Sequence, residues 1–295
     1  MILFWGLSAV ASQFDEEVAY ARLQKMVQIG HRYYGAKNRN QAIEYMRNQF
    51  TCDVWVVQKF VVEEPVSNKK YTLENHICRI APELSERVVL GSHFDTRLWA
   101  EEDEQEPNKP IPGANDGSSG VVVLMGVSDL IDQKRSTATL NIGVDLILFD
   151  GEEFGRPHLG NYCVGSRHLA QNIQELYPER LPLKAVILDM VADKDLMFRP
   201  ELSSQAKFPE LYNELWSLGL TVAPEHFRTK PWGIINDDQT PLMELGIPSA
   251  LLIDMEYEYW HTQQDTLDKC SAKSLKITGT LMWQWLDLQI FQETR

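Results

Sequence analysis

Positive charge is scarce in this sequence. Its 295 residues include 28 Lys and Arg against 42 Asp and Glu, which gives a formal net charge of −14 at pH 7. Nucleic acids and anionic lipids bind clustered positive charge, because that charge displaces their counterions. We therefore expect neither nucleic acid nor an anionic membrane surface as a partner.

Long apolar runs are also missing. No run reaches the ~20 apolar residues that a bilayer-spanning helix needs, so we expect no membrane span. Residues 1–12 hold a short apolar stretch that ends in Ala9-Val10-Ala11, a pattern typical of a signal-peptidase site, although no Lys or Arg precedes it. We interpret 1–12 as a signal or an apolar tail and 13–295 as one folded domain. Export is favoured over a cytoplasmic location.

Closely spaced cysteine pairs are absent as well. Cys52, Cys78, Cys163 and Cys270 are scattered, with no C-x-x-C spacing. This spacing excludes a zinc finger or a thioredoxin-like motif. Four cysteines permit two disulfides, but a domain of this size does not need them for stability. We therefore expect buried free thiols.

Short β-branched runs alternate with segments of helical spacing. The strand-like runs are 53–62, 86–95, 139–150, 184–191 and 248–254, and the helix-like segments are 14–29, 40–50, 118–133, 165–176, 208–219 and 272–292. Nearly continuous apolar strands alternating with helices are typical of a largely parallel sheet covered on both faces. No repeat or Pro/Gly-rich linker divides the chain. The predicted fold is α/β: a single domain with a mixed, mostly parallel central sheet flanked by helices.

Acidic and imidazole side chains follow these strands at their carboxyl ends, where open α/β sheets hold their sites. A further acid lies in the glycine-rich turn 112–117, immediately before a helix. The residues collected in this way are His93, Asp95, Asp116, Glu152, Glu153, Asp189 and His261.

Carboxylates gathered at one edge repel one another unless a cation lies between them. Imidazole and carboxylate without thiolate suit zinc, and a catalytic zinc takes three protein ligands. Asp116, Glu153 and His261 can supply that set. Glu152 would then face the substrate as a general base, and Asp95 would hold the His93 imidazole by its second nitrogen.

Each of these residues also has a simpler interpretation. A single His at a strand end is commonly a surface residue, paired Glu residues are commonly solvated, and Asn-Asp-Gly is first a turn signal. Their joint occurrence at successive strand ends favours a metal site. The acidic run at 101–106 is instead predicted to be a solvated loop.

These residues resemble the zinc aminopeptidases and, within the same fold, the glutaminyl-peptide cyclotransferases. The resemblance extends from about Phe14 to the final helix and implies a zinc aminopeptidase-like fold. The matching motifs are HFD at 93–95, GANDGSSG at 113–120, FDGEEFG at 149–155, LDM at 188–190 and HTQQDTLD at 261–268. They do not separate the two activities.

Further features are closer to the cyclotransferases. Trp260, before His261, resembles the tryptophan that walls their glutamine pocket, and Asp237 resembles an aspartate in their acid network. The resemblance implies an acyltransferase that cyclises N-terminal glutamine of peptides or proteins to pyroglutamate and releases ammonia. It implies one zinc per chain and catalysis by Glu152 with Asp189 and Asp237. We also expect the protein to be a monomer.

The sequence also departs from that pattern. Residues 154–160 contain no second tryptophan, and Tyr257 or Tyr259 replaces an expected phenylalanine. His93 and Asp189 are both present, so a two-zinc aminopeptidase stays open as the alternative. In it, His93, Asp116 and Asp189 would hold one metal, and Asp116, Glu153 and His261 the other. A third possibility is a binding protein that has kept the fold without catalysis.

Overall fold

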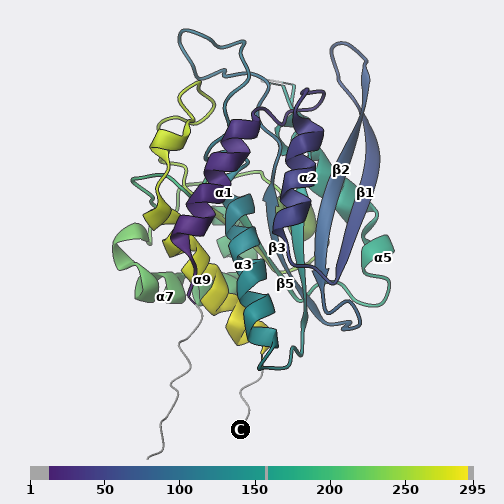
Figure 1. Cartoon of the computed structure of the whole chain (residues 1–295), viewed down its shortest axis with the longest axis vertical. Helices are drawn as coiled ribbons and strands as arrows, with labels where there is room; N and C mark the ends of the chain where they lie inside the picture. The colour runs from purple at the N-terminus through teal and green to yellow at the C-terminus, as the bar shows by residue number, and fades with distance from the viewer. Residues whose placement is uncertain (1–12, 157–158, 292–295) are drawn as a thin grey trace, which may run out of the picture.

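A mixed sheet forms the centre of the molecule (Figure 1). The computed structural model describes residues 13–156 and 159–291. In this part of the chain the sheet has six strands in the order β1-β2-β4-β3-β5-β6. Their bounds are β1 Val54–Glu63, β2 Lys70–Ile80, β3 Arg87–His93, β4 Gly143–Phe149, β5 Lys184–Asp189 and β6 Ser249–Ile253. The pairs β1/β2 and β2/β4 are antiparallel, and β3/β4, β3/β5 and β5/β6 are parallel. The predicted mixed, mostly parallel sheet is confirmed. The signal or tail predicted at 1–12 lies outside the described residues.

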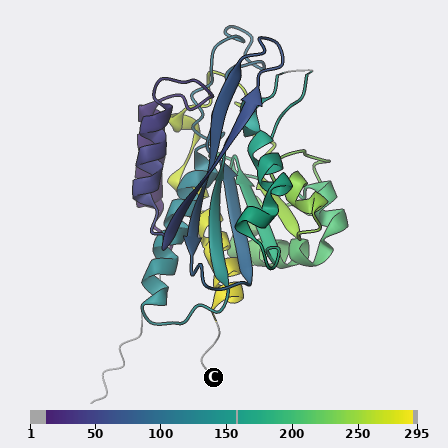
Figure 2. The ribbon, with the colours of Figure 1, turned by 90° about the vertical axis from the view of Figure 1, so that its right-hand side faces the viewer.

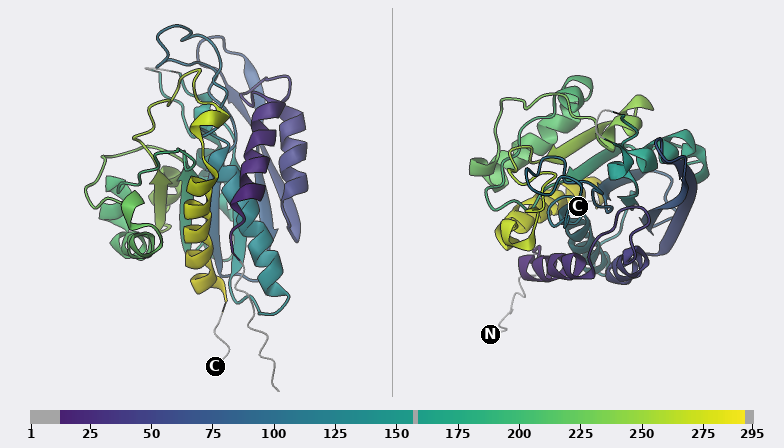
Figure 3. Two further views of the ribbon diagram at one scale, coloured as in Figure 1. Left: turned by 60° about the vertical axis from the view of Figure 1, so that its left-hand side comes forward. Right: turned by 90° about the horizontal axis from the view of Figure 1, so that it is seen from above.

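Helices cover both faces of the sheet (Figures 2 and 3). On one face lie α1 Glu16–Ile29, α2 Arg39–Gln49, α3 Ser119–Arg135 and α9 Ala272–Ile290, with α7 Pro209–Val222 beside α9. The opposite face holds α4 Val164–Gln171, α5 Ile173–Leu176 and α8 Gln239–Glu244. Shorter elements are α6 Leu202–Lys207, η1 Glu152–Phe154, η2 Pro224–His226 and η3 Leu267–Lys269.

The central strands are buried on both sides, which explains their continuous apolar sequences. Along β4, Val144, Leu146 and Leu148 belong to the core under α3 and α9. The alternating residues Ile147 and Phe149 belong to the core under α4 and α5. Because successive side chains of a strand point to opposite faces, a strand between two helical layers carries apolar residues on both faces. The buried exception on β4 is Asp145, which pairs with Arg87 (2.7 Å).

Strand β2 was not predicted, because polar residues interrupt its apolar pattern. Asn75 is fully buried and donates from Nδ2 to the carbonyl oxygen of Gly165 (2.8 Å), so a specific partner satisfies its amide. The predicted strand 139–150 begins four residues too early. Leu140 instead bridges Phe291 at the end of α9.

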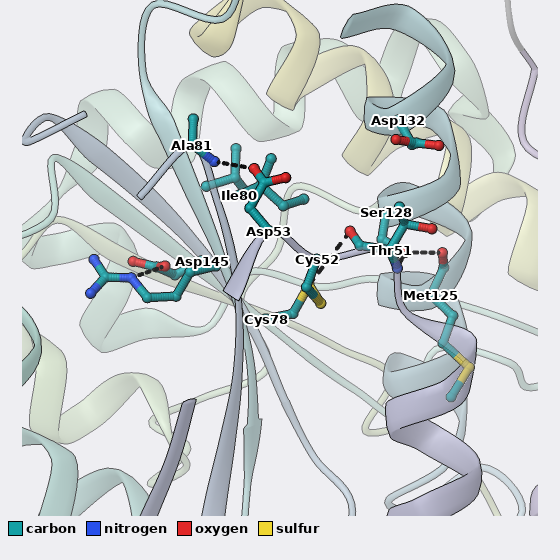
Figure 4. Close-up of a disulfide and its surroundings, with 12 residues drawn as sticks. Thr51, Cys52, Asp53, Cys78, Ile80, Ala81, Met125, Ser128, Asp132 and Asp145 are labelled. Carbon is teal, nitrogen blue, oxygen red and sulfur yellow. Dashed lines mark hydrogen bonds and ion pairs between the residues drawn. A yellow bond between two sulfur atoms is a disulfide. The ribbon is translucent and has the colours of Figure 1, made fainter. Parts of the chain in front are cut away.

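A disulfide joins Cys52 to Cys78, so the expectation of free thiols is wrong for this pair (Figure 4). Cys52 lies two residues before β1 and Cys78 lies on β2, and antiparallel pairing of these strands brings the two sulfurs together. The pair could not be foreseen without β2. Cys163 and Cys270 are buried free thiols, as expected.

The carboxyl ends of β3, β4, β5 and β6 point in one direction, toward the top of Figure 1. The loops that follow these strands therefore meet at that end of the sheet. No helix in the described ranges has both the length and the apolar character needed to cross a membrane.

Candidate active site

A cavity of about 320 Å³ opens where these loops meet. Seven of the residues predicted for the site line this cavity: Asp116, Glu152, Glu153, Asp189, Asp237, Trp260 and His261. His93 and Asp95 are not among its lining residues. The seven that line it come from five separate segments of the chain. The convergence predicted from the strand ends is therefore present.

Asp116, Glu153 and His261 form one group that could hold a metal ion. One ligand atom from each lies within 4.8 Å of the others, and all three residues are buried. His261 Nε2 lies 3.2 Å from Glu153 Oε1 and 3.7 Å from Asp116 Oδ2. Burial and the charge of Glu153 raise the pKa of Asp116 to about 8. Two carboxylates with one imidazole in so small a volume are a donor set that fits a divalent cation.

A second group adjoins the first and shares Asp116. His93, Asp116 and Asp189 also place one ligand atom each within 4.8 Å of the others. His93 Nε2 lies 3.0 Å from Asp189 Oδ1 and 3.2 Å from Asp116 Oδ1. The geometry thus offers a place for a second cation, as the two-metal alternative requires.

Glu152 stands beside the first group in an acidic cluster of its own. Its Oε1 accepts a hydrogen bond from the thiol of Cys163 (3.1 Å), and Asp237 lies in the same cluster. Burial raises the pKa of Glu152 well above its usual range, and the charges of Glu153 and Asp237 raise it further. The pKa of Asp237 is also raised well above its usual range by burial and by Asp189. Carboxyl groups with pKa values raised in this way are suited to hold and pass a proton.

Asp95 positions the two glutamates rather than the His93 ring. Its Oδ1 accepts the backbone N–H of Glu152 (3.2 Å), and its Oδ2 accepts that of Glu153 (3.1 Å). The distance from Asp95 Oδ1 to His93 Nδ1 is 3.6 Å, too long for a hydrogen bond. Gly117, with φ of 82°, lets the turn that carries Asp116 approach the backbone of Asp95 closely, because a Cβ at Gly117 would lie 2.1 Å from the Asp95 carbonyl oxygen.

Asp265 fixes the turn that carries Asp116, a role that the sequence analysis missed. Its carboxylate accepts the backbone N–H groups of Asn115 (2.8 Å) and Asp116 (3.2 Å), and Tyr257 donates its hydroxyl to it (2.7 Å). The only signal for this role is that Asp265 stands within the HTQQDTLD motif.

The aromatic residues of the cavity wall differ from those that the resemblance to cyclotransferases implies. Tyr257 and Tyr259 are not among the residues that line the cavity, whereas Tyr162 is. Tyr162 accepts a hydrogen bond from Arg97 Nη2 (3.0 Å). It supplies an aromatic ring on the cavity wall, where residues 154–160 contribute no tryptophan.

Trp260 and His261 form a stacked pair at the mouth of the cavity. Their ring centroids are 3.9 Å apart, and Trp260 remains 36% exposed. His261 has a left-handed backbone with φ of 53°, which L-residues seldom adopt. Strained backbone of this kind clusters at functional sites, where the surrounding structure holds it in place.

Comparison with known proteins agrees with this geometry. Residues 75–286 match the family described as Peptidase family M28. A bovine glutaminyl-peptide cyclotransferase-like protein is 26% identical over 235 residues, which make up 71% of this chain and 58% of that protein. The chain thus spans less than two thirds of the length of this relative.

Solved structures match nearly the whole chain. A glutaminyl cyclase from Fimbriiglobus ruber has a TM-score of 0.86 at 29% identity and covers 95% of this chain and 97% of its own. A Zn-dependent exopeptidase from Parabacteroides distasonis has a TM-score of 0.84 at 27% identity, covering 93% and 98%. The fold is therefore zinc aminopeptidase-like, and the chain belongs to peptidase family M28.

Proposed function

We propose that this protein converts N-terminal glutamine of peptides to pyroglutamate with release of ammonia, using one zinc ion. The observation that carries the proposal is the pairing of Glu152 with Asp237 on the wall of the cavity, directly beside Asp116, Glu153 and His261. The proposal is also supported by the similarity of this chain to proteins named glutaminyl-peptide cyclotransferase-like protein and glutaminyl cyclase.

Asp116, Glu153 and His261 would hold the zinc ion. The chemistry that zinc supplies when bound is polarisation of the γ-amide carbonyl and stabilisation of the negative charge that develops on its oxygen. The cavity of about 320 Å³ is at the small end of the ~300–1,000 Å³ typical of ligand pockets. It suits a single glutamine side chain better than an extended peptide.

Glu152 would move the proton that the reaction must transfer. The α-amino nitrogen attacks the γ-carbonyl carbon, a new C–N bond closes the ring, and the bond to the amide nitrogen breaks. Glu152 accepts a proton from the attacking amine and returns one to the departing nitrogen, which leaves as ammonia. Asp237 would assist this transfer, because burial raises its pKa well above the usual range and so favours a carboxyl group that can share a proton with Glu152. Asp189 would assist from the same cavity wall.

Trp260 would keep water from the carbonyl carbon. Water that attacked the same carbon would yield glutamate instead of pyroglutamate. An indole ring stacked on His261 at the cavity mouth would cover the approach to that carbon from solvent, which supports this role.

A two-zinc aminopeptidase is the second candidate, favoured by the convergence of His93, Asp116 and Asp189. Here Asp116 would bridge two metals, and Glu152 would activate water for hydrolysis of a peptide bond. The similarity to a Zn-dependent exopeptidase supports the aminopeptidase as this second candidate. A binding protein without catalysis is disfavoured, because an inert scaffold has no need to bury mutually repelling carboxylates.

A metal count combined with a substrate assay separates these candidates. Purified protein is analysed for zinc per chain and assayed on a glutaminyl peptide and a leucyl peptide. One zinc with release of ammonia supports the cyclase. Two tightly held metals with release of leucine would replace it by the aminopeptidase, and no metal and no turnover would favour the binding protein.

Glu152→Gln tests the role of the proposed proton carrier. We expect turnover to fall by about 10²–10⁴-fold, the usual contribution of a general acid–base group. Bound zinc should be unchanged, because Glu152 is not one of the three proposed ligands. A variant that kept most of its activity would remove Glu152 from the mechanism.

The disulfide supports export. Structural disulfides form and persist in oxidising compartments and are rare in the cytosol of mesophiles, and this chain links Cys52 to Cys78. Fractionation of cells that produce the protein, together with thiol titration of the product, tests this location.

A further inference from the structure

The acidic run at 101–106 is more than the solvated loop that its composition indicates. The side chains of Glu102, Glu104 and Glu106 are exposed, as predicted. Glu101 instead turns inward, lines the cavity and keeps only 21% of its side chain exposed. The expectation is therefore wrong for Glu101.

Contacts join this loop to the segment that carries His261. Glu101 Oε1 lies 3.1 Å from His261 Nδ1. The backbone N–H of Glu102 donates to the carbonyl oxygen of His261 (3.2 Å), and that of Gln263 donates to Asp103 Oδ2 (2.9 Å). The side chain and the backbone of His261 are thus both held by the same acidic loop.

Arg97 fixes the orientation of Glu101. This guanidinium is fully buried, and it donates from Nε to Glu101 Oε1 (2.9 Å) and from Nη2 to the same oxygen (2.5 Å). Through Nη1 it also contacts Glu153 Oε2 (3.2 Å) and the carbonyl oxygen of Gly155 (2.7 Å). One arginine therefore holds both the carboxylate behind His261 and a second candidate ligand, Glu153.

We propose that Glu101 is a positioning residue of the metal site: it accepts the Nδ1 proton of His261 and so directs the Nε2 lone pair toward the ion. His261 Nε2 is the ring atom that faces Glu153 and Asp116. A hydrogen bond at Nδ1 therefore selects the tautomer that can bind at Nε2. The inference rests on the proposed metal site and adds the residues that orient it.

The stacked ring of Trp260 limits rotation of the imidazole from its face, and Glu101 limits it in the ring plane. Removal of a carboxylate that holds a metal-binding histidine typically lowers metal affinity by about 10–100-fold. We expect a loss of this size for Glu101→Ala. A smaller loss is expected for Glu101→Gln, which keeps an acceptor oxygen but loses the charge.

Zinc binding to the full-length chain tests the proposal without any need for substrate. The zinc dissociation constant is measured by competition with a chelator for the unmodified protein, Glu101→Ala, Glu101→Gln and Glu104→Gln. Glu104 is the matched control, because it belongs to the same acidic run but its side chain is exposed. Circular dichroism and thermal unfolding without metal report whether each variant is folded.

A 10–100-fold loss of affinity in folded Glu101→Ala, with Glu104→Gln unchanged, supports the role. Equal losses in Glu101→Gln and Glu104→Gln would overturn it, since general charge reduction would then account for the effect. Unchanged affinity in a folded Glu101 variant would also overturn it. If the unmodified protein binds no zinc, the proposed function fails and this inference fails with it, whereas tight binding in every variant refutes the inference alone.

Discussion

The disulfide between Cys52 and Cys78 should contribute strongly to stability. The two residues are separated by 26 positions, so the bond closes a loop that the unfolded chain would otherwise leave open. The chain-entropy relation for a loop of that length corresponds to about 3.5 kcal/mol at 25 °C. This is a large part of the ~5–15 kcal/mol that stabilises a typical folded protein.

Urea unfolding followed by tryptophan fluorescence measures this contribution. The free energy of unfolding is compared for the oxidised protein, the reduced protein and a Cys52→Ala/Cys78→Ala variant. Reduction keeps both side chains and removes only the covalent bond. It therefore separates loop closure from the loss of packing at Cys78, which is fully buried on β2.

We expect both the reduced protein and the double variant to lose about 3 kcal/mol or more. Turnover at low temperature should be unchanged, because Cys78 lies opposite Leu146, on the amino-terminal side of Phe149, after which the site begins. A loss below about 1 kcal/mol in the reduced protein would refute the loop-closure reasoning, since the relation predicts several times that value.

Three further variants test the site and the core. Cys163→Ala removes the thiol that lies 3.1 Å from Glu152 and should lower kcat more than it changes KM, whereas Cys163→Ser keeps a hydrogen-bond donor and should lose less activity. Cys270→Ala, which removes the other buried thiol, is the control. If steady-state kinetics were the same for all three variants, the Cys163–Glu152 hydrogen bond would have no role in turnover. Trp260→Ala should raise the proportion of glutamate relative to pyroglutamate among the products, measured by mass spectrometry, and an unchanged ratio would mean that the ring does not exclude water. Burial lowers the pKa of His76 to about 4 in the folded protein, so as the pH falls below 6.5 the His76 imidazole is protonated in the unfolded chain before it is protonated in the folded one. The free energy of unfolding should then decrease by up to about 3 kcal/mol between pH 6.5 and 4 relative to His76→Leu, and equal pH slopes for the two proteins would show that His76 is not the cause.

The parallel part of the fold could be predicted because its physical cause is local. Strands β3, β4, β5 and β6 lie between two helical layers, so each is a nearly continuous apolar run that is visible in the sequence. Strand β2 could not be found in this way. Its Asn75 and His76 are buried through partners or packing that only the assembled sheet supplies.

The cavity residues could be predicted because they follow the strand ends. Glu152 and Glu153 begin the short helix that follows β4 after two residues, and Asp189 ends β5, so sheet topology brings them to one edge. His261 needed the further observation of its motif, because a short loop separates it from β6.

The residues that orient the ligands could not be predicted, because they act across long separations and through ordinary residue types. Glu101 and His261 are 160 positions apart, and Asp265 accepts the N–H of Asp116 across 149 positions. In the sequence, Glu101 is one acid among several in a charged run, and nothing there separates it from Glu104. Arg97, which is buried beneath the loop, and His261 both contact that one side chain and hold it inward. A site of this kind is therefore specified twice: strand order brings the ligands together, and a few buried ion pairs between loops set the direction in which each ligand points.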